Sequence, residues 1–173
     1  GADCAGSTNL LGKDLAYQVT IPASTLLTVT LDSPFDGILY LVTDCGEEEL
    51  GESCLAGADS TAEENGTEVL EYANESESEV TAYLIVDSWL LDAGSEFDLS
   101  VALDEITTPA NHTGDAATDL TGGTIEGTTY GAANDYGPTA DGCTSGDRPG
   151  QDVVYQLYLA DTDYVAVDAT STT

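Results

Sequence analysis

The chain has 173 residues, of which 33 are Asp or Glu and only 2 are Lys or Arg, so its formal net charge at pH 7 is -31. A surface this acidic repels nucleic acids and anionic membranes, and we therefore exclude both as partners. Hydrophobic residues make up 41% of the chain and lie in short runs, which is enough apolar material to fold as one ordinary domain or two small ones.

The first half of the chain predicts a series of short β-strands. Apolar side chains alternate with polar or small ones in most of them, and one run is apolar on both faces and reads as a central strand. The alternating positions are Leu15 to Ile21, Leu27 to Leu31, Val69 to Tyr72, Val80 to Val86 and Phe97 to Leu103, and the central run is Ile38 to Val42. No segment has a 3.6-residue period. We therefore expect an all-β, antiparallel β-sandwich.

Four cysteines lie along the chain, and Cys45 and Cys54 flank a short acidic loop. This spacing predicts a disulfide across a hairpin loop. Cys4 and Cys143 have no local partner; they could bond to each other, join successive subunits, or bond to cysteines outside this sequence. Because the chain has a single His, zinc binding by the cysteines is disfavoured, and an oxidising, extracellular or cell-surface location is predicted.

An internal repeat is the strongest sign of domain organisation. The segment Gly12-Lys-Asp-Leu-Ala-Tyr-Gln-Val19 recurs as Gly150-Gln-Asp-Val-Val-Tyr-Gln-Leu157, and a cysteine precedes both copies. We expect a sandwich over residues 1–105 that lacks its first strand, a linker over 106–118, and the front part of a second repeat over 119–173.

The two copies are cut at different places. A strand candidate, Gly122 to Tyr130, precedes the second copy and has no counterpart ahead of Cys4, whereas the second copy lacks the later strands of the first. A sandwich missing a strand leaves unpaired backbone groups and uncovered core. These would be filled in a longer tandem array, or by the segment after about residue 112, either of the same chain or of a neighbouring copy. The residues expected to donate a strand are Thr124, Ile125, Val153, Tyr155, Leu157 and Leu159.

No stretch reads as a signal peptide or is apolar and long enough to span a membrane, and a start at Gly1 suits a processed or shortened chain.

The motifs together resemble a known family. Gly-x-Asp-Val-Val-Tyr-x-Leu at 150–157, Phe35 to Leu41, Asp44-Cys45 to Cys54, and Thr81 to Asp87 resemble bacterial pre-peptidase C-terminal type domains. The resemblance covers about residues 10–104 and 119–170. It implies a jelly-roll-like β-sandwich, often in tandem on secreted enzymes and surface proteins, that acts as a spacer or binding module. No enzyme domain accompanies the repeats here.

Catalysis is not expected. Triad-type hydrolysis needs a His beside a nucleophile, and His112 lies in a polar linker. Pairs of carboxylates could in principle hydrolyse glycosides, but in a chain with 33 Asp and Glu residues such pairs do not indicate a glycosidase. We therefore predict that the protein is not an enzyme.

Calcium and glycans are the two ligands to consider. Asp135, Asp141, Asp147 and Asp152 cluster along one acidic segment and could bind calcium, although the spacing matches no standard calcium loop and a solvated acidic loop is the alternative. No other cofactor is expected. Asn-x-Ser/Thr triplets at Asn65, Asn74 and Asn111 predict N-linked glycans.

The predicted function is that of a structural subunit of an extracellular filament or cell-surface layer. Copies of the chain would join head to tail by β-strand complementation, with Cys4 and Cys143 as further links. The alternative is a carbohydrate- or calcium-binding accessory module of a larger secreted protein.

Overall fold

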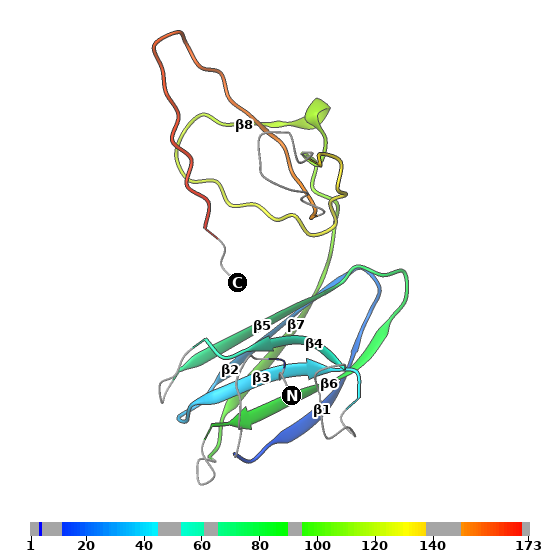
Figure 1. Ribbon diagram of the computed structural model, residues 1–173. Helices are drawn as coiled ribbons and strands as arrows, with labels where there is room; N and C mark the ends of the chain where they lie inside the picture. The colour runs from blue at the N-terminus through cyan, green and yellow to red at the C-terminus, as the bar shows by residue number, and fades with distance from the viewer. Residues whose placement is uncertain are drawn as a thin grey trace. The chain divides into compact units, whose positions relative to one another are not determined.

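The computed structural model describes residue 4 and residues 12–44, 53–60, 66–89, 95–137 and 150–170 (Figure 1). The chain divides into two compact units, Gly1–Glu105 and Ile106–Thr173. Each unit is described by itself.

The first unit is a sandwich of two antiparallel sheets, which confirms the predicted fold class. A four-stranded sheet has the order β1-β6-β3-β4, and a three-stranded sheet has the order β5-β2-β7. The strands are β1 (Leu15–Ile21), β2 (Thr25–Asp32), β3 (Gly37–Val42), β4 (Cys54–Ala58), β5 (Thr67–Asn74), β6 (Val80–Ser88) and β7 (Asp98–Glu105).

Alternation in the sequence places the core between the sheets. In β2 the side chains of Leu27, Val29 and Leu31 are fully buried, while the residues between them are only half-buried. Strand β3 is buried along its whole length because it lies between β6 and β4 and is apolar on both faces. The main core also takes in Ile21, Leu39, Leu41, Leu70, Ala82, Leu84 and Val86.

A second apolar cluster lies on the outer face of the four-stranded sheet. Ile38, Tyr40, Val42 and Ile85 are buried there, and Cys4 packs against them. Cys4 therefore contributes to covering this face.

The disulfide differs from the one predicted. Cys4 bonds to Cys54, 50 residues away, with 5.4 Å between their Cα atoms. The predicted pairing of Cys45 with Cys54 is wrong, as is a bond between Cys4 and Cys143. Cys54 begins β4, whose neighbour β3 carries the apolar cluster that holds Cys4, so tertiary packing and not loop spacing selects the partner. Cys45 and Cys143 lie outside the described residues.

The second unit has little regular structure. It contains the 3₁₀ helix η2 (Gly114–Ala116), and β8 (Thr118–Asp119) pairs in parallel with β9 (Tyr155–Gln156). The strands expected at Gly122 to Tyr130 and at Val153 to Leu159 are therefore corrected to irregular chain, apart from β9. In the first unit β1 forms by pairing with β6, and the described part of the second unit has no equivalent of β6. Nowhere in the described ranges is there a helix long and apolar enough to cross a membrane.

Candidate assembly site

The inward face of β1 is exposed where a core is expected. Leu15 and Tyr17 pair with Val86 and Leu84 of β6, and paired residues of antiparallel strands project from the same face of the sheet. Val86 and Leu84 are each only 3% exposed, because they point into the core. Leu15 and Tyr17, however, are 53% and 41% exposed, so core-facing side chains at this edge meet solvent.

Strand β7 shows the same pattern in the other sheet. Val101 and Leu103 pair with Val29 and Leu27 of β2, which are fully buried. Their own exposed fractions are 50% and 46%. The inward face of β7 is therefore also uncovered.

The opposite side of the sandwich is closed. Strand β4 lies against β5, where Leu70 is 1% exposed and Leu55, Ala56 and Ala58 pack on the core. With β4 over β5, the strand orders leave β1 and β7 as the edge strands of the other side, and the four-stranded sheet extends one strand further there. We call the uncovered strip formed by Leu15, Tyr17, Val101 and Leu103 the open seam.

Exposed apolar side chains also gather in the second unit. Leu157, Leu159, Val165 and Val167 are 38%, 46%, 49% and 72% exposed. Leu157, Leu159 and Val165 line a shallow hollow of ≈ 530 Å³, together with Asp119 of β8 and residues 120–122 that follow it. The apolar faces that sequence alternation predicted are present, but no sheet covers them within the described part of this unit.

The two copies of the repeat differ at their first glycine. A Cβ added to Gly12 would lie 1.6 Å from the carbonyl oxygen of Ser88 in β6, so only glycine permits this approach. A Cβ added to Gly150 would meet nothing within 4 Å. Among the residues that the structure describes, the motif in the second copy therefore has no strand packed against it in the way that β6 packs against the first copy.

The residues predicted to donate a strand all lie in the second unit. Tyr155 belongs to β9, and the others are in irregular chain, namely Thr124, Ile125, Val153, Leu157 and Leu159. The amides of Thr118 and Leu120 donate to the carbonyl oxygens of Val154 and Gln156, at 3.1 and 2.8 Å. One backbone edge of residues 154–156 is thus paired with β8.

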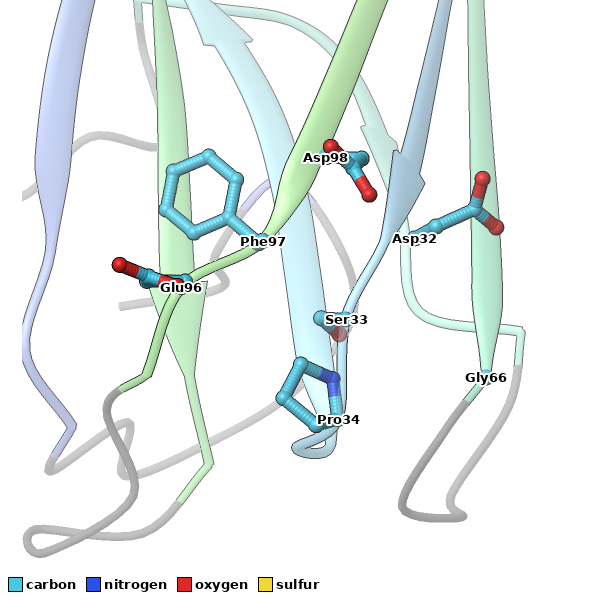
Figure 2. Close-up of a pocket in the computed structure, with 7 residues that line it drawn as sticks. All are labelled: Asp32, Ser33, Pro34, Gly66, Glu96, Phe97 and Asp98. Carbon is cyan, nitrogen blue, oxygen red and sulfur yellow. The ribbon is translucent and has the colours of Figure 1, made fainter.

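An acidic hollow lies at the end of the three-stranded sheet (Figure 2). Asp32 of β2 pairs across the sheet with Asp98 of β7, and Glu96 stands two residues before Asp98. Phe97 points to the other side of the strand, where its ring meets Phe35 edge to face with centroids 6.3 Å apart. Like charges placed directly opposite destabilise a sheet unless a cation or solvent screens them.

Two carboxyl groups of the sandwich are perturbed. Burial, followed by repulsion from Asp59 and Glu68, raises the pKa of Asp36 above its usual value of 3.8. Burial also raises the pKa of Asp87, although hydrogen bonds from the Ser88 amide and the Tyr40 hydroxyl oppose the shift. Neither carboxyl group belongs to the open seam. The alternation of apolar residues in the sequence did not predict either pKa shift.

The predicted calcium ligands are only partly within reach. The Tyr136 amide donates to Asp152 Oδ2 at 3.0 Å, and Asp135 Oδ2 lies 3.4 Å from His112 Nδ1. Asp141 and Asp147 lie outside the described residues. In the ranges that the structure describes, no three His, Cys, Asp or Glu side chains are grouped to hold a metal ion.

The predicted glycosylation sites have different surroundings. Asn74 is 2% exposed, and its amide nitrogen donates to the carbonyl oxygens of Ile21, Pro22 and Ser78. A glycan on this nitrogen is incompatible with the folded sandwich, which corrects the prediction there. Asn111 is half-buried and donates to the Val154 carbonyl at 3.2 Å, and Asn65 lies outside the described residues.

Comparison of the chain with protein-family models, with curated proteins and with solved structures finds no match.

Proposed function

We propose that the protein is a structural subunit of an extracellular filament or cell-surface layer, in which copies join by β-strand complementation. The observation that carries this proposal is the open seam. Four large core-facing side chains there are about half exposed, at the edge of a sandwich that is closed on its other side.

Covering the open seam would be favourable. Burying a Val or Leu side chain fully is worth about 1.5 to 3 kcal/mol, and these side chains are already about half buried. A strand added at this edge would also pair the free N–H and C=O groups of an edge strand, which otherwise invite association. The seam therefore suits an extended, apolar segment of chain better than a small ligand.

A second copy of the same chain can supply such a segment. The second unit holds the sequence predicted to donate a strand, from Thr124 and Ile125 to Val153, Tyr155, Leu157 and Leu159, and the apolar side chains of this set are exposed or half-buried. Because donor and acceptor are different surfaces, the contact is heterologous and would grow a head-to-tail polymer instead of closing.

Other features agree with a role outside the cell. The resemblance to pre-peptidase C-terminal type domains supports a jelly-roll-like module on a surface protein. The Cys4–Cys54 disulfide suits an oxidising compartment. Glycans at Asn65 and Asn111 are part of the same proposal.

The test is the oligomeric state of the purified chain, with and without reductant. We expect concentration-dependent assembly by light scattering after gel filtration, and filaments or sheets by negative-stain electron microscopy. Assembly that persists in reductant would show that strand pairing, and not an intermolecular disulfide, joins the copies. A stable monomer under both conditions at high concentration would remove the proposal.

A further inference from the structure

We propose that the acceptor for assembly is the free edge of β7, and that its occupant is the segment Val153 to Leu159 of a second copy. This assignment rests on the proposed function and specifies which surfaces meet. The three-stranded sheet would become four-stranded, in the order β5-β2-β7-donor, and the donor would lie over β1.

The arrangement of the two sheets selects β7 among the four edge strands. Strands β4 and β5 lie on the closed side, where the core is already covered. A strand added to β1 would extend a sheet that already reaches one strand beyond its partner, so nothing would face it. A strand added to β7 would instead face β1 and cover Leu15 and Tyr17. The side chains of the added strand would also contact β7, its neighbour in the sheet, and cover Val101 and Leu103.

The side chains of the donor match the seam. Val153, Tyr155, Leu157 and Leu159 alternate, so in an extended strand all four project from one face. The open seam offers four large apolar side chains in return. Seven donor residues also fit the eight residues of β7.

Charge favours this segment over the other donor candidate. Strand β7 carries Asp98, Asp104 and Glu105, and an acidic donor beside it would be repelled. Residues 153–160 contain no charged side chain. The candidate at Gly122 to Tyr130 contains Glu126 and presents only Ile125 as a large aliphatic side chain.

The donor segment has a backbone edge, facing away from β8, that can pair with another strand. The carbonyls of Val154 and Gln156 accept hydrogen bonds from Thr118 and Leu120. Since successive residues of a strand direct their backbone groups to opposite edges, the groups of Tyr155 and Leu157 face away from β8. The segment can therefore pair with β7 of a second copy without leaving β8.

Disulfide trapping between two variants tests the assignment. In a Cys45→Ser/Cys143→Ser background that keeps Cys4 and Cys54, one preparation carries Leu157→Cys and a second carries Leu99→Cys, Val101→Cys or Leu103→Cys. We mix the two preparations under mild oxidation and measure the yield of cross-linked dimer. For at least one of the three β7 positions, we expect this yield to be at least fivefold higher than for the control partner. The control partner is Val69→Cys on β5, because Val69 is also an edge-strand valine and is 49% exposed against 50% for Val101.

A second variant separates this inference from the proposed function. Leu157→Asp places a charge on the donor face, and we expect it to raise the concentration needed for assembly at least tenfold. If the background protein assembles but cross-links at Val69, or at no β7 position, and Leu157→Asp assembles normally, the β7 assignment is overturned while assembly stands. If the background protein does not assemble at any concentration, the proposed function itself fails.

Discussion

Asp36 lies directly before β3 with a buried Oδ1 atom that has no hydrogen-bond partner among the described residues. Burial and the nearby Asp59 and Glu68 raise its pKa above 3.8. A raised pKa means that the folded state disfavours the charged form. The stabilisation from protonated Asp36 is therefore fully present below pH 3.8 and is lost as pH rises through the raised pKa.

The variant Asp36→Asn should be more stable than the natural chain at pH 7, because it removes a partly buried charge that two other carboxylates repel. The advantage should shrink as pH falls below the raised pKa, where Asp36 is itself neutral. Urea unfolding at several pH values would measure both effects. Glu77→Gln, in the exposed β5–β6 turn, is the control and should show little change; equal effects of the two variants would contradict the prediction.

Asn74 acts as a structural clamp between the β1–β2 and β5–β6 turns. Its amide nitrogen donates to three carbonyl oxygens, and its Oδ1 accepts from the amide and hydroxyl of Ser76. Replacing it with Ala leaves buried acceptors unpaired, which costs about 1 to 3 kcal/mol for a buried polar group. We expect Asn74→Ala to lower the free energy of unfolding by about 2 kcal/mol or more, measured by urea denaturation, whereas Glu77→Ala nearby should cost little.

At the scale of elements, the two copies of the repeat motif give a matched pair of glycine variants. Gly12→Ala must push Ser88 and β6 away, and overpacking of this kind costs about 1 to 3 kcal/mol. Gly150→Ala has open space and should leave the melting temperature unchanged. Calorimetric melting of both variants would check this, and equal destabilisation would show that the second copy packs against a strand as the first does.

The sequence predicted strands correctly where apolar residues alternate with polar ones and a neighbouring strand is present to pair with. Leu27, Val29 and Leu31 show the period of two and lie on the core face of β2, and Ile38 to Val42 reads and folds as a central strand. Strand β4 was missed, because Cys54-Leu-Ala-Gly-Ala58 is short, nearly all small residues, and follows an acidic loop.

The reverse error occurred in the second unit. Val153 to Leu159 has a strand pattern as clear as that of Leu15 to Ile21, yet only Tyr155–Gln156 pairs. Pairing is non-local, so a sequence pattern states that a segment can be a strand and not that a partner exists. For the same reason the open seam could not be located from the sequence, since it depends on which strands lie at the sheet edges.

At the scale of the whole molecule, a net charge of -31 opposes association of copies. Screening shortens the range of this repulsion from about 30 Å at 0.01 M salt to about 3 Å at 1 M. We expect assembly to begin at a concentration at least tenfold lower in 1 M than in 0.01 M sodium chloride, measured by sedimentation velocity. Assembly that weakens as salt rises would instead point to ion pairs as the attractive force.

The Cys4–Cys54 bond has a mechanical consequence for a subunit under tension. Strands β1, β2 and β3 all lie within the 50-residue stretch that it spans, so a pull along the chain bypasses them. At about 3.4 Å per extended residue, the disulfide prevents roughly 170 Å of chain from extending. Optical-tweezer extension of a single subunit should lengthen by about that amount when a reducing agent is added, and the oxidised subunit should act as a short, stiff tether.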